Sequence, residues 1–204
     1  MNLEEISYKP IIKNGEYLFS SSIEFDKPVE IHFKDIFNPT NKTFDISFLA
    51  SWYNIHRPGY LRRAKLWNRK EEIIIPKQFY TSIKTFSNTE SSLPGGEKES
   101  LFDSMFHVAI ENQSIANYFT EKLVDAFLTE TIPVYWGCPN INEYFDLDGM
   151  IIFDTIDEMI ENVNLLTKEY YMDRKEVILN NKKKAIKFSN FDERIATLIR
   201  GVNK

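Results

Sequence analysis

One stretch of the chain, residues 106–139, constrains the fold more than any other. Its sequence, FHVAIENQSIANYFTEKLVDAFLTETIPVYWGCP, predicts a buried strand, a polar loop, an amphipathic helix, a second apolar strand and a turn. Polar or turn-forming residues interrupt this unit at three points: Glu111-Asn112, Tyr118 with Thr120-Glu121-Lys122, and Gly137-Cys138-Pro139. Nucleotides dock at strand ends and helix starts of α/β sheets, so the interruptions predict a nucleotide site.

The same alternation of strand and helix extends to both sides of this stretch. Strands are expected at 44–50, 73–75, 106–110, 132–136 and 150–153. Helices are expected at 59–70, 118–128, 140–145, 155–166 and through the charged segment 168–200. Strands that alternate with helices predict an α/β fold with a mostly parallel sheet covered on both faces.

Three segments divide the chain. Residues 1–43 contain short strand-like runs broken by turn signals, which predicts a β-rich lead-in. Residues 44–167 form the α/β domain, and residues 168–204 form a helical tail. Within the domain, the polar stretch 81–97 contains Pro94-Gly95-Gly96 and is a candidate mobile loop.

Composition excludes several classes of protein. Hydrophobic residues make up 43% of the 204 residues and aromatic residues 14%, which is enough for a packed core. A net charge of -5 argues against a nucleic-acid partner. The single cysteine, Cys138, excludes an intrachain disulfide and a Cys-based zinc site. No apolar run approaches the ~18 residues of a membrane span, so we expect a soluble, cytoplasmic protein.

The basic helix at 59–70 carries a candidate anion ligand. Arg62 falls in its first turn, where an arginine side chain and free backbone N–H groups can share a phosphate. A solvated basic face is the alternative for Arg62. It is the preferred interpretation for Lys65, Arg69 and Lys70.

The helix near residue 120 carries two more candidates. Thr120 or Asn117 can cap it, and Lys122 in the first turn then opposes the helix dipole unless an anion lies there. Glu121 suits the dipole, but a carboxylate at this place can also accept hydrogen bonds from ribose hydroxyls. Glu111 stands at the carboxyl end of a buried strand, where polar residues are often functional.

Other chemistries find little support. The sequence contains neither a glycine-rich phosphate loop nor a GxSxG nucleophile elbow. Its three histidines, His32, His56 and His107, lack metal-ligand spacing, so no metal is expected.

The ordered motifs resemble glycosyltransferase family 10, the α1,3/α1,4-fucosyltransferases. Three pieces carry this resemblance in order: Ile110-Glu111-Asn112-Gln113, Tyr118-Phe119-Thr120-Glu121-Lys122, and the turn from Thr131 to Pro139. The upstream segment LRRAKLW is similar to the arginine-bearing helix of the family, with Arg62 as the match. The resemblance covers residues 44–153.

The resemblance implies a fold, a donor and roles for residues. The fold would be the Rossmann-like C-terminal half of a GT-B enzyme, and the donor a GDP-sugar, most often GDP-fucose, transferred with inversion to a glycan acceptor. Arg62 and Lys122 would hold the diphosphate, and Glu121 the ribose. Asn112 and Tyr118 would contact phosphate or sugar. Glu111 would lie close to the transferred sugar as the catalytic candidate, without a metal or other cofactor.

The chain also departs from the family pattern. Residues 1–43 are too short for the acceptor-binding domain that supplies the general base in family members. The alternative is therefore a GDP-sugar-binding module or pseudoenzyme that needs a partner, and a homodimer is one such arrangement. The basic segment from Lys182 to Phe188 predicts either peripheral membrane contact or a solvated helix end.

Overall fold

The computed structural model describes residues 42–51, 56–81, 93 and 98–189, together with the antiparallel pair β1 (Ile11–Lys13) and β2 (Glu16–Leu18). The rest of the predicted lead-in, most of the predicted loop at 81–97 and the tail after residue 189 lie outside the described residues.

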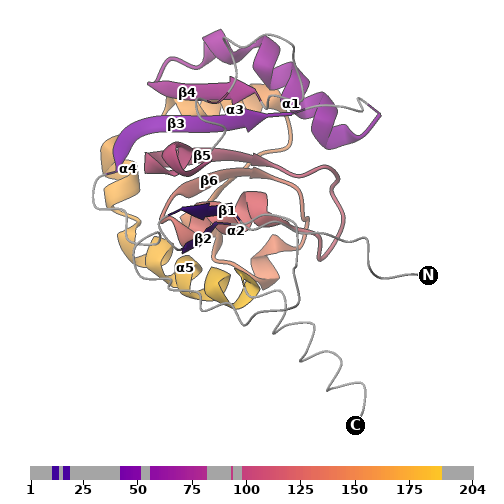
Figure 1. Cartoon of the computed structure of the whole chain (residues 1–204). Helices are drawn as coiled ribbons and strands as arrows, with labels where there is room; N and C mark the ends of the chain where they lie inside the picture. The colour runs from indigo at the N-terminus through magenta and orange to yellow at the C-terminus, as the bar shows by residue number, and fades with distance from the viewer. Residues whose placement is uncertain are drawn as a thin grey trace, which may run out of the picture.

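The main sheet has five strands, all parallel, in the order β4-β3-β5-β6-β7. They are β3 (Thr43–Ala50), β4 (Lys77–Thr81), β5 (Ser104–Ile110), β6 (Ile132–Trp136) and β7 (Ile151–Ile152). The chain adds β4 on one side of β3 and the later strands on the other, as Figure 1 shows. The strand order therefore reverses between β3 and β5, where open α/β sheets bind ligands at the carboxyl ends of their strands. The predicted parallel α/β sheet is confirmed.

Helices cover both faces of this sheet. The α-helices are α1 (Pro58–Asn68), α2 (Glu121–Leu128), α3 (Ile156–Asn164), α4 (Lys168–Met172) and α5 (Lys175–Ser189). Short 3-10 turns are η2 (Lys70–Glu72), η5 (Glu99–Asp103), η6 (Ile141–Glu143) and η7 (Leu147–Gly149). Alternate residues of β5 enter two cores: Phe106 and Val108 pack toward α1 and α3, and Ala109 packs toward α2.

The strand predicted at Ile73–Ile75 is wrong, because β4 begins two residues later. Ile73 closes the turn η2 through a backbone bond to Lys70 and is buried, while Ile74 is 79% exposed. Pairing with β3 begins only at Pro76, whose carbonyl accepts from the Ile46 N–H at 2.9 Å. The β-branched apolar run at 73–75 therefore places Ile73 in the core and forms a bend before β4 instead of a strand.

Local capping signals were predicted correctly. Thr155 accepts a hydrogen bond from the N–H of Glu158 and begins α3. Thr120 caps α2, so this helix begins at Glu121 rather than at Tyr118. Asn117 instead has a φ of 64°, the left-handed conformation that asparagine tolerates in turns.

The helical tail packs onto the α2 side of the domain. The Asn181 side chain donates to the Asp146 carbonyl and accepts from the Asp146 N–H, both at 2.8 Å. Lys182 is 9% exposed and pairs with Glu130 at 2.7 Å, so one lysine of the basic segment is held inside the fold. Among the described residues, no helix is long and apolar enough to cross a membrane.

Candidate functional site

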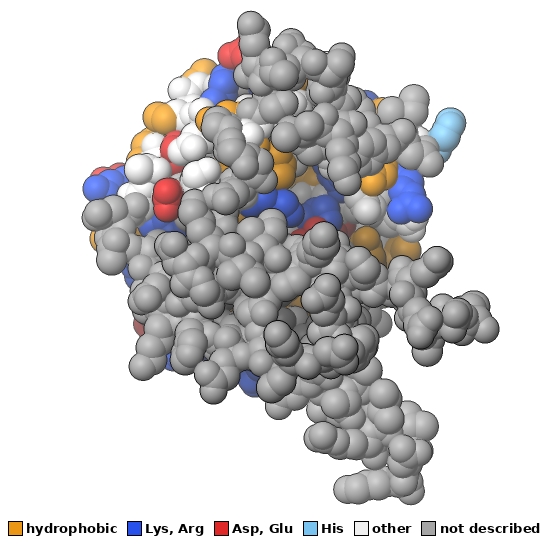
Figure 2. All heavy atoms as spheres, viewed as in Figure 1, with side chains coloured by type: hydrophobic (Ala, Val, Ile, Leu, Met, Phe, Trp, Pro, Cys, Tyr) orange, Lys and Arg blue, Asp and Glu red, His pale blue; other side chains and the backbone are white. Residues whose placement is uncertain are grey.

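A cavity of about 270 Å³ lies at the switch point between β3 and β5. Its polar walls come from α1, from β5 and the residues after it, and from α2: Arg63, His107, Asn112, Glu121, Lys122 and Asp125. Figure 2 shows basic side chains gathered at the centre of the same face, with an acidic one beside them. Three predicted site residues, Asn112, Glu121 and Lys122, therefore line one cavity.

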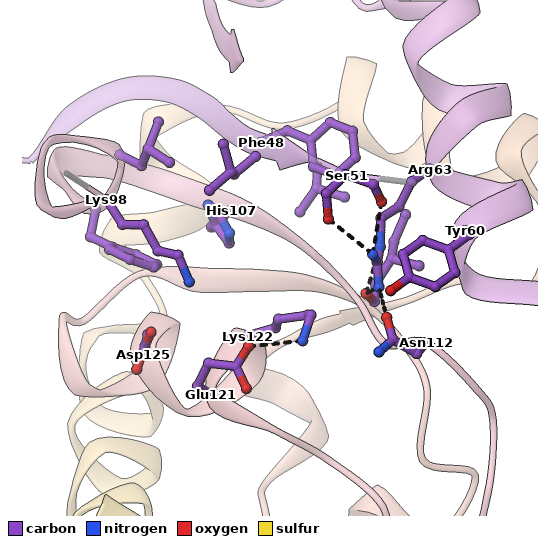
Figure 3. Close-up of a pocket in the computed structure, with 15 residues that line it drawn as sticks. Phe48, Ser51, Tyr60, Arg63, Lys98, His107, Asn112, Glu121, Lys122 and Asp125 are labelled. Carbon is purple, nitrogen blue, oxygen red and sulfur yellow. Dashed lines mark hydrogen bonds and ion pairs between the residues drawn. The ribbon is translucent and has the colours of Figure 1, made fainter. Parts of the chain in front are cut away.

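The first turn of α2 presents a paired carboxylate and ammonium. The Lys122 Nζ donates to Glu121 Oε1 at 2.9 Å (Figure 3). It also donates to Thr120 Oγ1 at 3.1 Å. Burial opposes ionisation of Glu121, but the charge and hydrogen bond of Lys122 lower the pKa of this carboxyl below its usual value. Glu121 thus offsets the unfavourable position of Lys122 at the positive end of the helix.

Glu111 ties the end of β5 to the start of α2. Its side chain is fully buried and accepts hydrogen bonds from the Thr120 N–H at 2.7 Å and the Thr120 hydroxyl at 2.8 Å. Burial raises the pKa of Glu111, against the opposing effect of Lys122, whose Nζ lies 3.9 Å away. Glu111 does not line the cavity, so its catalytic role stays a prediction, and the contacts present are those of a positioning residue.

Replacing Glu111 with glutamine should lower the free energy of unfolding by about 1–3 kcal/mol, since the amide nitrogen would face a donor of Thr120. Urea unfolding measures the change, with the exposed Glu161→Gln as the matched control. A double-mutant cycle with Thr120→Val should give strong coupling. Additive effects of the two substitutions would contradict this role.

Close packing behind Glu111 requires a glycine. A Cβ on Gly137 would lie 2.5 Å from Glu111 Cγ and 2.5 Å from the Tyr135 hydroxyl oxygen. The Tyr135 hydroxyl in turn accepts from the Cys138 N–H at 2.9 Å. The turn after β6 therefore packs against the Glu111 side chain, while Thr120 donates hydrogen bonds to its carboxylate.

Arg63, which the sequence analysis missed, faces the cavity from α1. It is 3% exposed and donates to the Ile110 carbonyl at 2.8 and 3.1 Å, to the Ser51 carbonyl at 2.9 Å and to Asn112 Oδ1 at 2.5 Å (Figure 3). Burial lowers the pKa of Arg63 from its usual value, but an arginine stays protonated in proteins. Since no described carboxylate forms an ion pair with it, Arg63 leaves positive charge at the cavity wall.

Asn112 is oriented by this contact. Its side-chain oxygen accepts from Arg63, so its amide nitrogen is left for a ligand. The backbone carbonyl of Asn112 accepts from the Gly59 N–H at 3.1 Å, which joins α1 directly to the end of β5.

The other two predicted ligands lie outside the cavity wall. The Arg62 guanidinium stacks 3.9 Å from the centre of the Trp136 ring and donates to the Asp154 carbonyl at 3.3 Å, at the ends of β6 and β7. Tyr118 is partly buried, and burial followed by the charge of Glu111 raises its pKa. The binding roles of both residues stay predictions.

The opposite end of the cavity holds buried polar groups. The Nδ1 of His107 lies 2.8 Å from the Ser47 hydroxyl, and burial, with Lys98 and Lys42 nearby, lowers the pKa of His107 to about 3. Burial raises the pKa of Asp125 to about 8, although Lys98 and Lys122 oppose this rise. The Oδ1 atom of Asp125 is buried and has no hydrogen-bond partner within the part of the chain that the structure describes.

Ionising Asp125 should make the stability of the protein fall as pH rises. Its pKa is raised from 3.8 in the unfolded chain to about 8, so its contribution is present below pH 4 and is lost as pH rises through 8. The free energy of unfolding of Asp125→Asn, relative to that of the wild type, should therefore rise by at least about 1.4 kcal/mol from pH 5 to pH 8. Urea unfolding at both values measures this gain. A constant difference between the two proteins would contradict the raised pKa.

In the described ranges, no group of three or more His, Cys, Asp or Glu residues is placed to hold a metal ion. Arg63, Lys98 and Lys122 are the basic residues among those that line the cavity.

Residues 46–176, more than half of the chain, match the pattern described as glycosyltransferase family 10 (fucosyltransferase), C-terminal part. The chain belongs to glycosyltransferase family 10. Similar family members include the alpha-(1,3)-fucosyltransferase FucT of Helicobacter pylori, 33% identical over 82 residues, which span 38% of this chain and 17% of that protein. The 4-galactosyl-N-acetylglucosaminide 3-alpha-L-fucosyltransferase 9 of Mus musculus is 24% identical over 190 residues, 89% of this chain and 49% of that protein.

Solved structures give the same assignment to the family 10 fold. A crystal structure of an α1,3-fucosyltransferase matches with a TM-score of 0.51 and 27% identity over 68% of this chain and 39% of that one. A structure of an α1,3-fucosyltransferase with GDP-fucose matches with a TM-score of 0.50, also at 27% identity and over the same shares. The predicted Rossmann-like half of a GT-B fold is confirmed. The chain spans about half or less of the length of these relatives.

Proposed function

We propose that this chain is the donor-binding part of a glycosyltransferase that transfers fucose from GDP-fucose to a glycan with inversion. The observation that carries the proposal is the cavity at the switch point, where Glu121 and Lys122 of α2 face Arg63 of α1. An anionic nucleotide-sugar fits this arrangement because its diphosphate needs cations and its ribose needs an acceptor. The solved relative that contains GDP-fucose supports the choice of donor.

In the proposed complex, the donor would separate the ion pair between Lys122 and Glu121. Glu121 would accept from the ribose hydroxyls, and Lys122 would turn to the diphosphate, where Arg63 adds a second positive charge and the Asn112 amide adds a donor. Arg62 remains a further candidate because it lies near the same edge of the sheet, over Trp136. These cations would stabilise the charge that develops on GDP as the sugar leaves, without a metal.

Inverting transfer also needs a base for the acceptor hydroxyl. Glu111 is the residue that the family resemblance suggests beside the transferred sugar. Its buried bonds to Thr120 favour the positioning role, so we assign the base to a group outside the described cavity. A cytoplasmic location, a homodimer and membrane contact by the basic tail stay predictions.

Transfer of labelled fucose tests this proposal. The mouse relative is named for a 4-galactosyl-N-acetylglucosaminide acceptor, so the purified chain is incubated with GDP-fucose and this disaccharide. We expect a fucosylated product whose anomeric configuration, read by NMR, is inverted relative to the donor. Binding of GDP-fucose without any product would favour the binding-module alternative. Failure to bind GDP-fucose would contradict both.

A further inference from the structure

The loop between β5 and α2 contains a tight turn at residues 115–118. The Tyr118 N–H donates to the Ile115 carbonyl at 3.2 Å, and Asn117, the third residue of the turn, has a φ of 64°. A turn of this kind needs a residue that tolerates a positive φ, which is glycine or asparagine. Residues 114–117 are exposed, so the conformation of the turn depends on the groups that hold it from outside.

Asn140, which directly precedes the turn η6, holds the turn at 115–118. Its Oδ1 accepts from the Asn117 N–H at 2.8 Å, and its Nδ2 donates to Asn117 Oδ1 at 2.7 Å. The backbone donor fixes which way the Asn140 amide faces, because only its oxygen can accept from an N–H. The Cys138 thiol donates to the same Oδ1 at 3.0 Å, and the Tyr144 hydroxyl donates to Asn117 Oδ1 at 2.7 Å. The two asparagine side chains therefore tie the turn to the segment after β6.

The residue that this turn places is Tyr118, a predicted ligand of the donor. Tyr118 stands two residues before Thr120, whose hydroxyl accepts from the Lys122 Nζ at 3.1 Å. Burial and the charge of Glu111 raise the pKa of Tyr118, and the charges of Lys122 and Glu121 also act on its hydroxyl. The Tyr118 hydroxyl therefore lies near the ion pair that the proposed donor would separate.

We propose that Asn140 is a positioning residue for the donor site: through Asn117 it holds the turn at 115–118 and so keeps Tyr118 beside the donor. Asn140 does not line the cavity, so it would act on binding through the loop. Without Asn140, the loop would have to be ordered when the donor binds, which lowers the affinity. This inference rests on the proposed GDP-sugar function and adds a residue from the segment after β6 to its donor site.

Titration calorimetry of the full chain with GDP-fucose tests the proposal. Asn140→Ala should lower the affinity by about tenfold relative to the wild type, because the turn loses the group that holds it. The exposed Asn180→Ala on α5 is the matched control and should bind like the wild type. Wild-type affinity in Asn140→Ala would overturn the proposal and leave the proposed function standing. A wild type that does not bind GDP-fucose would overturn both.

Substitutions of Asn117 test the same step without altering the core, because this side chain is exposed. Asn117→Gly and Asn117→Ala both lose the side-chain bonds and both keep the backbone N–H that Asn140 accepts. They differ in the cost of the positive φ, which glycine adopts freely and alanine does not. The alanine variant should therefore bind GDP-fucose about tenfold more weakly than the glycine variant. Equal affinities would overturn the role of the turn.

Coupling between Asn140 and Tyr118 separates positioning from a merely structural role. If Asn140 acts through Tyr118, then Asn140→Ala should change the affinity by less than about twofold in a Tyr118→Ala background. A merely structural role would lower the midpoint of thermal unfolding in both backgrounds and leave the affinity of the folded chain unchanged. Additive effects of the two substitutions on the affinity for GDP-fucose would overturn the proposal.

Discussion

Replacing Lys122 with alanine is expected to lower the affinity for GDP by about 100-fold, because a desolvated charge-assisted contact to the diphosphate is lost. The fold should remain intact. Lys122 stands in the first turn of α2, where a cation opposes the helix dipole, so its removal costs little stability. Titration calorimetry measures the affinity, and thermal unfolding checks the fold.

The exposed Lys183→Ala on α5 is the matched control for this prediction and should bind GDP like the wild type. Arg62→Ala and Arg63→Ala extend the comparison to the two arginines of α1. The larger loss is expected for Arg63, which lines the cavity, than for Arg62, which stacks on Trp136. Wild-type GDP affinity in Lys122→Ala would contradict the assignment of the diphosphate site.

Gly59→Ala is expected to destabilise the domain by about 3 kcal/mol or more, since overpacking here involves backbone. A Cβ at this position would lie 1.7 Å from the Glu111 carbonyl oxygen and 2.9 Å from the Asn112 carbonyl carbon. For a chain of this size the midpoint of thermal unfolding should fall by on the order of 10 °C. GDP binding should weaken too, because Asn112 must move.

The direction of the stability change in Gly59→Ala distinguishes helix propensity from close packing. Helix propensity alone predicts that alanine at the second position of α1 is more stable than glycine by up to about 1 kcal/mol. Contact between α1 and the end of β5 predicts the opposite. Lys65→Ala, on the exposed side of the same helix, controls for propensity and should not destabilise. A gain in stability for Gly59→Ala would contradict the close packing.

Much of the fold could be predicted because its signals are local. The capping residues Thr120 and Thr155 each begin a helix. The strands β3, β5 and β6 are rich in apolar residues, and β5 and β6 are buried at every position, as expected for strands covered on both faces. The run at Ile73–Ile75 misled because its role depends on Pro76 and on packing under α1. Strand composition alone does not contain that information.

The candidate site could be predicted in part for a similar reason. Asn112, Glu121 and Lys122 follow a strand or begin a helix, and both places meet at one edge of a parallel sheet. The choice between Arg62 and Arg63 depends on the phase of α1, whose buried face is Gly59, Arg63 and Leu66. That spacing of four and three residues was available in the sequence. Lys98 could not be predicted from the sequence, because only the tertiary fold brings it to the same cavity as the residues of α2.

The most direct test of the central claim is calorimetric titration of the purified chain with GDP, GDP-fucose and UDP in the absence of divalent metal. We expect GDP and GDP-fucose to bind at one site and UDP not to bind. Binding that requires a divalent metal, or equal affinity for UDP, would contradict a guanine-nucleotide site built from Lys122, Glu121 and Arg63.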